Sequence, residues 1–135
     1  MISPTADSIR IALHLIAVAV WVGGQIMLAG IVPTMRRNVP ESTKVLAQAF
    51  SKVAWPAFIV AIATGMWNLA VQDPADQGGS YAATFGVKML FVVLAGIATA
   101  VHSSGKSKVA LAVGGAVGLL SSLIAFFLGV QLGHF

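Results

Sequence analysis

Long apolar runs separated by short polar segments dominate the chain, and they predict four membrane-spanning helices. We place the spans at residues 9–32, 53–71, 85–101 and 109–132. Each has a length within the roughly 17 to 25 residues that an α-helix needs to cross a bilayer. None shows the sustained alternation of apolar and polar residues that marks the strands of a membrane β-barrel. Helices are therefore the structure that can satisfy the backbone hydrogen bonds in lipid.

The composition supports a membrane protein of the all-α class. The chain has 135 residues, of which 58% are hydrophobic and only 9% charged, whereas a water-soluble domain carries roughly 25% charged residues. Four spans use most of this length, so we expect a single four-helix transmembrane bundle over residues 1–135 and no added catalytic domain. The chain has no cysteine, which excludes disulfide bonds, thiolate metal sites and a thiol nucleophile.

Most of the charged residues lie in the loops, and they predict the orientation of the chain. In the connection between the last two spans all charged residues are basic, whereas the charged residues of the central connection are Asp73 and Asp76. Cytoplasmic loops of membrane proteins are enriched in lysine and arginine, so we expect both termini on the outer side of a bacterial inner membrane. The net charge of +4 therefore indicates topology, and we expect no nucleic-acid partner. The basic residues of the two inner connections are Arg36, Arg37, Lys44, Lys52, Lys106 and Lys108.

Small residues and prolines predict how the helices begin and pack. Pro40 opens an amphipathic helical segment that leads into the second span, and Pro56 is expected to mark a kink or the membrane boundary. Small residues recur every three or four positions in the fourth span, which is typical of close helix contacts and of pairing with a second copy or a larger membrane complex. These small residues are Gly114, Gly118, Ser122, Ala125 and Gly129.

Polar side chains inside the apolar spans are the main candidates for function. Arg10, His14, Trp21 and Gln25 follow one another at offsets of four, seven and four residues, so they share one face of the first helix. We expect this face to point into the bundle, because ionisable residues in a membrane are costly and usually functional. A second row on the third span runs from Lys88 to His102, which we place in a solvated inner loop, while Gln25 is expected to bond a neighbouring helix.

The segment "LHLIAVAVWVGG" resembles the first-helix motif of CopD-type copper-resistance membrane domains, in which a histidine is followed by a tryptophan and two glycines. Weaker similarity continues through "FSKVAWPAFIVAIATGMWNL" and "YAATFGVKMLFVVLAGIATA". The family usually has more helices, so this chain would be a minimal version of it. Its architecture is similar to that of four-helix membrane b-type cytochromes, and the resemblance therefore implies a heme-associated histidine at His14.

Heme b requires one or two neutral imidazoles, small residues beside the macrocycle and cations for its propionates. His14 would supply the imidazole, Trp21 a wall, and Arg10 and Lys88 the cations. His134 and Met66 are the candidates for a second axial ligand. The glycines that could leave room for a macrocycle are Gly23, Gly24, Gly65 and Gly86.

Copper is the alternative cofactor. Copper(I) prefers imidazole and thioether ligands, and His14, Met66 and Met89 could provide them for a copper transport or tolerance protein. A third hypothesis is a structural accessory subunit of a larger respiratory complex, in which the polar row serves helix packing.

Hydrolytic enzymes are poorly supported by the sequence. The four acidic residues all lie in tails or loops, and no span carries paired carboxylates, a phosphate-binding glycine loop or a nucleophile beside a base. We therefore expect no enzyme of these classes, and an oxidoreductase role would depend on a bound heme.

Overall fold

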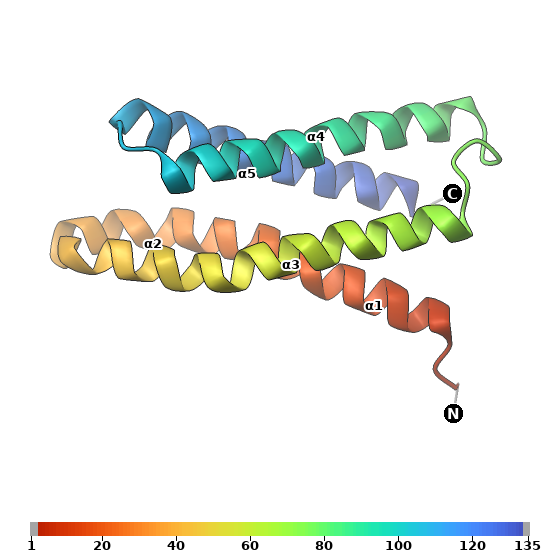
Figure 1. The fold of residues 1–135 in the computed structure, drawn as a ribbon, viewed down its shortest axis with the longest axis horizontal. Helices are drawn as coiled ribbons and strands as arrows, with labels where there is room; N and C mark the ends of the chain where they lie inside the picture. The colour runs from red at the N-terminus through yellow and green to blue at the C-terminus, as the bar shows by residue number, and fades with distance from the viewer. Residues whose placement is uncertain (1–2, 134–135) are drawn as a thin grey trace. The chain divides into compact units, whose positions relative to one another are not determined.

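The computed structural model describes residues 3–133, and this part of the chain is helical without any strand. Four helices are long and apolar enough to cross a membrane, as the sequence predicts. Each predicted span lies inside one of them (Figure 1). In chain order the elements are α1 (Ala6–Val18), the π-helical segment η1 (Ala19–Gly23), α2 (Gly24–Asn38), the 3-10 segment η2 (Pro40–Ser42), α3 (Thr43–Val71), α4 (Gly79–Ser104) and α5 (Lys108–Leu132).

The helices form two compact units, Met1–Val71 and Gln72–Phe135. In the first unit, α1, η1 and α2 form one continuous helix that packs against α3. In the second unit, α4 packs against α5 (Figure 1). Each unit is thus a helical hairpin with its own contacts. The helical class and the four spans are confirmed, and the assembly of the hairpins into one bundle stays a prediction.

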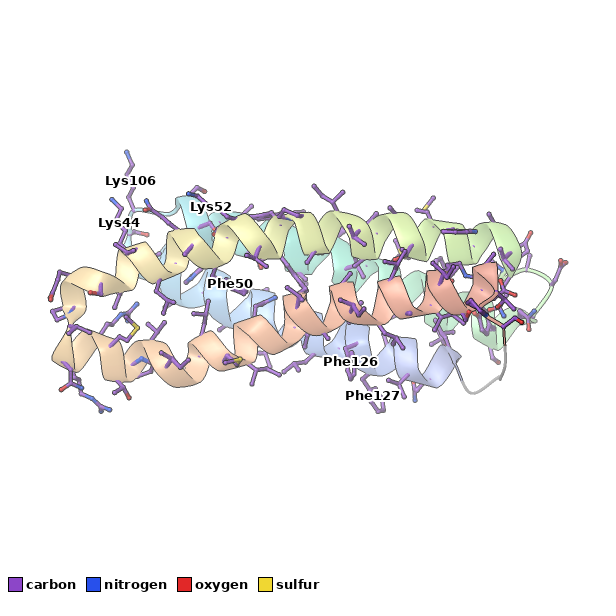
Figure 2. The ribbon with its side chains drawn as sticks, turned by 90° about the horizontal axis from the view of Figure 1, so that it is seen from below. Lys44, Phe50, Lys52, Lys106, Phe126 and Phe127 are labelled. Carbon is purple, nitrogen blue, oxygen red and sulfur yellow. The ribbon has the colours of Figure 1, made fainter. Side chains whose placement is uncertain are left out.

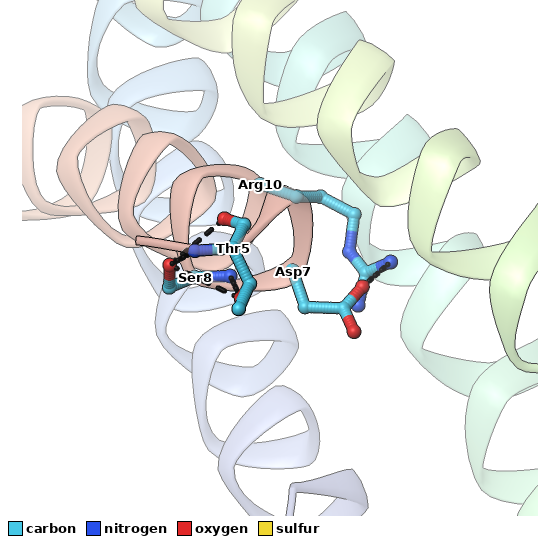
Figure 3. Close-up of polar contacts among 4 residues, drawn as sticks. All are labelled: Thr5, Asp7, Ser8 and Arg10. Carbon is cyan, nitrogen blue, oxygen red and sulfur yellow. Dashed lines mark hydrogen bonds and ion pairs between the residues drawn. The ribbon is translucent and has the colours of Figure 1, made fainter. Parts of the chain in front are cut away.

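The first helix begins with a hydrogen-bonded cap and is longer than a membrane requires. Thr5 accepts a hydrogen bond from the backbone amide of Ser8, and the Ser8 hydroxyl accepts one from the backbone amide of Thr5 (Figure 3). The helix continues for 33 residues to Asn38, or about 50 Å at 1.5 Å per residue. The hydrocarbon core is only about 30 Å thick, so the end that carries Arg36 and Arg37 extends beyond it.

The π-helical segment η1 lies in the middle of the first helix, which the sequence did not predict. Both Trp21 and its neighbour Val22 are buried there. In an ordinary α-helix two consecutive residues differ by about 100° in direction, whereas the wider π turn lets both face the partner helix. Such insertions often occur at functional sites.

The second helix starts as predicted and passes through its proline. Pro40 occupies the first turn of η2, which leads directly into α3. Pro56 lies inside α3, and the helix continues on both sides of it. The prediction of a helical lead-in is confirmed, and the chain is not interrupted at Pro56.

The small residues of α5 allow close packing against α4, as predicted. A Cβ atom added at Gly114 would lie 2.8 Å from the backbone nitrogen of His102 and 2.9 Å from the carbonyl oxygen of Ala98. A Cβ atom added at Gly118 would lie 2.8 Å from the Thr99 hydroxyl oxygen. Only glycine therefore allows the two backbones to approach this closely.

Candidate functional site

His14 on α1 contacts Thr64 on α3, and this contact is the centre of the candidate site. The Nδ1 atom of His14 lies 2.8 Å from the hydroxyl oxygen of Thr64, 50 positions away in the chain. Thr64 is buried and His14 is partly buried. The predicted inward direction of His14 is therefore confirmed within the first unit.

The bonds of Thr64 determine where the proton of His14 lies. The Thr64 hydroxyl donates to the carbonyl oxygen of Val60 at 2.7 Å and is 3.2 Å from that of Ala61. Carbonyl oxygens only accept hydrogen bonds, and a hydroxyl has one proton to donate. With the Thr64 proton directed to one of these carbonyls, its oxygen accepts from His14, and Nδ1 carries the proton. In the neutral ring Nε2 is then the unprotonated nitrogen.

Gly65 and Met66, which follow Thr64, have different positions relative to His14. A Cβ atom added at Gly65 would lie 3.6 Å from Cε1 of His14, so Gly65 lies beside the imidazole. Met66 is 54% exposed. Thr64 and Gly65 therefore both lie against His14, whereas the Met66 side chain is exposed.

Trp21 belongs to an aromatic cluster with Trp55 and Phe58 of α3. The ring centroid of Trp21 lies 4.3 Å from that of Phe58 and 5.5 Å from that of Trp55, and the latter two are 5.8 Å apart. These spacings are those of favourable aromatic pairs. Trp21 therefore packs between the helices, and Trp55 contributes to the same cluster.

Gly24 provides space for an aromatic ring. A Cβ atom added at Gly24 would overlap the ring of Phe50 on α3, whereas one added at Gly23 would meet nothing within 4 Å. The space beside Gly24, which we predicted for a macrocycle, is occupied by this ring in the first unit. Gly24 thus has a packing role in the hairpin.

Arg10 lies one helical turn before His14 and is buried. The residue is 4% exposed, and one terminal nitrogen, Nη1, lies 2.9 Å from the Asp7 carboxylate, whose side chain is 67% exposed (Figure 3). The Nε atom is buried without a hydrogen-bond partner in the part of the chain that the structure describes. Arg10 does not extend freely toward solvent, because its guanidinium group is buried beside α1.

Gln25 donates from Nε2 to the carbonyl oxygen of Trp21, four residues earlier in the same helix, at 3.2 Å. The acceptor lies within η1, where the π turn alters the regular pattern of backbone bonds. The bond from Gln25 to a neighbouring helix stays a prediction.

The other predicted ligands do not join His14 within its hairpin. Lys88 lies on α4 in the second unit, where a Cβ atom added at Gly129 would be 3.2 Å from its Nζ atom. Met89 and Gly86 also lie on α4, and His134 falls outside the described residues. No three His, Cys, Asp or Glu side chains gather within residues 3–133 as a metal site.

The position of His102 differs from the predicted one. We placed it in a solvated inner loop, but it lies inside α4, and its Nδ1 donates to the carbonyl oxygen of Leu111 on α5 at 2.6 Å. The loop assignment was wrong, because hydropathy falls before the helix ends, whereas the side chain is exposed as predicted. The absent side chain of Gly115 makes space for the ring, since an added Cβ there would lie 3.0 Å from Nδ1.

Thr64 is the functional residue that the sequence did not identify as a partner of His14. The Thr64-Gly65 pair was visible as part of a resemblance, and a hydroxyl residue in an apolar span usually bonds a carbonyl of its own helix. Thr64 does so here, and its second bond depends on the rotation and depth of α1, which the sequence of α3 cannot show.

Comparison with protein-family models, with curated proteins and with solved structures gives no match for the chain. The function is therefore inferred from the residues themselves.

Proposed function

We propose that the chain binds heme b within the membrane through the imidazole of His14 and takes part in electron transfer. The observation that carries this proposal is the hydrogen bond between His14 Nδ1 and the Thr64 hydroxyl. Histidines that ligate metals almost always donate their second ring nitrogen to a nearby acceptor, which fixes the tautomer and the ring orientation. Gly65 lies beside the ring, where an added Cβ atom would be 3.6 Å from Cε1.

Arg10 supports an anionic ligand near His14. A buried guanidinium group is costly unless charges and hydrogen bonds compensate it. Asp7 compensates one end of the group from an exposed position, and Nε has no acceptor among the described residues. A heme propionate is a carboxylate that could accept this hydrogen bond. Arg10 and His14 lie four residues apart, on one face of α1, as a ligand bound by both would require.

The residues have distinct roles in this proposal. His14 would hold the heme iron, Thr64 would orient the imidazole, Gly65 would lie beside the ring, and Arg10 would bind a carboxylate of the cofactor. Bound heme b supplies one-electron exchange. The aromatic cluster around Trp21 excludes water from the interior of the hairpin. The resemblance to CopD-type domains agrees with these roles, and an electron partner in a larger respiratory assembly of the bacterial inner membrane is part of the same proposal.

Absorption spectroscopy tests the proposal directly. The chain is expressed with a heme supply, purified in mild detergent and compared in its oxidised and reduced forms. We expect a sharp reduced-state α band and about one heme per chain, because one oriented histidine provides one site. His14→Ala should lose the band while retaining its helix content by circular dichroism.

His102→Ala is the matched control, since it removes the exposed histidine of the second hairpin. This variant should keep its heme. A colourless wild-type protein, or a His14→Ala protein with an unchanged spectrum, would refute the proposal. Copper that copurifies with the colourless protein and depends on His14 would favour the copper hypothesis instead.

A further inference from the structure

The hairpin of α4 and α5 contains an open apolar groove close to its turn. The groove has a volume of about 390 Å³, and its walls include Ala98 and Val101 of α4 and Ala110, Val113 and Val117 of α5. Its lining is made of alanine and valine side chains with Gly114 among them. Its volume is within the range of small-molecule binding sites.

The groove has the length of one leaflet of the bilayer. It extends from Ser107, the N-cap of α5, to Val117. The ten residues from Lys108 to Val117 span about 14 Å along the helix, and half of the hydrocarbon core is about 15 Å. A single acyl chain that enters from the lipid headgroup level would therefore reach along the whole groove.

Two cations stand at the turn end of the groove. Lys106 and Lys108 flank Ser107, the one polar residue in the groove wall, and both lysines are exposed. Figure 2 shows Lys106 projecting away from the helices at this end. Neither lysine forms an ion pair with any residue between positions 3 and 133. The turn end of the groove is thus positively charged, while its deeper walls are apolar.

We propose that this groove is a binding site for one anionic phospholipid, independent of the heme proposal. One acyl chain lies between Val101 and Val113, and the phosphate lies beside Lys106 and Lys108. The distribution of charge identifies the occupant. An anionic headgroup fits the basic turn end of the groove, and an acyl chain fits its apolar walls. Basic residues at the membrane surface between helices bind anionic lipids in this way.

The proposal is tested by lipid retention. The full chain is purified in mild detergent, given phosphatidylglycerol and phosphatidylcholine in equal amounts, and examined by native mass spectrometry. We expect one phosphatidylglycerol to remain bound in preference to phosphatidylcholine. The double variant Lys106→Gln/Lys108→Gln should lower this preference about 30-fold, as expected for two charges near an anionic surface. Lys44→Gln/Lys52→Gln removes the same charge from α3 and should leave the preference unchanged.

A second pair of variants tests the groove itself. Val113→Phe places a ring in the groove and should abolish retention of the lipid, with both lysines still present. Val93→Phe is its control, because Val93 on α4 has the same exposure of 55% and lies outside the groove. The proposal is overturned if lipid retention does not depend on the charge of the headgroup, or if the lipid is still retained by Val113→Phe. A change of oligomeric state in Val113→Phe would also overturn it, since the groove would then hold a second copy of the chain.

Discussion

Thr64 has two hydrogen bonds with different consequences for His14. Its proton goes to the Val60 carbonyl of its own helix, and its oxygen accepts the Nδ1 proton of His14. The hydroxyl therefore favours the tautomer that carries its proton on Nδ1. The sequence predicted the face shared by Arg10, His14 and Trp21, because that face depends only on helical spacing. It did not predict Thr64 as the partner, because that depends on how two helices meet.

Replacing Thr64 tests its role as a positioning residue. Thr64→Val keeps the shape of the side chain but removes the acceptor, so we expect the affinity for heme to fall about 10- to 100-fold, as for other residues that orient a metal ligand. Thr64→Ser keeps the hydroxyl and should restore most of the affinity. Heme titration of the apoprotein measures both. Equal affinity of Thr64→Val and the wild type would show that Thr64 only packs, and a shifted reduction potential in Thr64→Val would support the orienting role.

At the scale of the elements, the two helices within each hairpin are held together by different kinds of contact. In the first, bulky aromatic rings pack between α1 and α3, and the π segment η1 turns both Trp21 and Val22 inward. In the second, glycines let α4 and α5 touch through their backbones. The glycine contact was predictable from the repeated spacing in one helix, whereas no sequence pattern indicated the π segment.

The glycine contact predicts an unequal effect of two identical substitutions. Gly114→Ala forces a Cβ against the backbone of α4, and overpacking of this kind costs about 1–3 kcal/mol. Gly86→Ala on α4 adds a Cβ that meets nothing within 4 Å. Both gain the same helix propensity of roughly 1 kcal/mol, so their difference reports the contact alone. Unfolding in mixed detergent, followed by circular dichroism, should show Gly114→Ala to be the less stable by that 1–3 kcal/mol. Equal stabilities would contradict a close backbone contact.

For the whole molecule, the four helices extend past the predicted spans at most of their ends. The first runs from Ala6 to Asn38, although its apolar core covers residues 9–32. Hydropathy locates the part of a helix that lies in lipid, while capping residues and turns determine where the helix stops. Four membrane crossings would put both termini on one side, which the basic connections predict to be the outer one.

The orientation can be tested with little background because the chain has no cysteine. Asp76→Cys lies in the connection between α3 and α4, and Ser104→Cys lies at the end of α4. In right-side-out membrane vesicles, we expect an impermeant maleimide to label Asp76→Cys at once and Ser104→Cys only after permeabilisation. The reverse pattern would place both termini inside. Labelling of both positions without permeabilisation would contradict the four-span topology.

The sequence by itself determined the helical class, the four spans, the charged connections and the faces on which His14 and the glycines lie. These properties depend on local composition and on the fixed geometry of a helix. Only the tertiary structure decided that Thr64 bonds His14, that Phe50 lies against Gly24 and that His102 bonds Leu111. Such contacts depend on the rotation and depth of one helix against another, which side-chain packing sets and which no single helix contains.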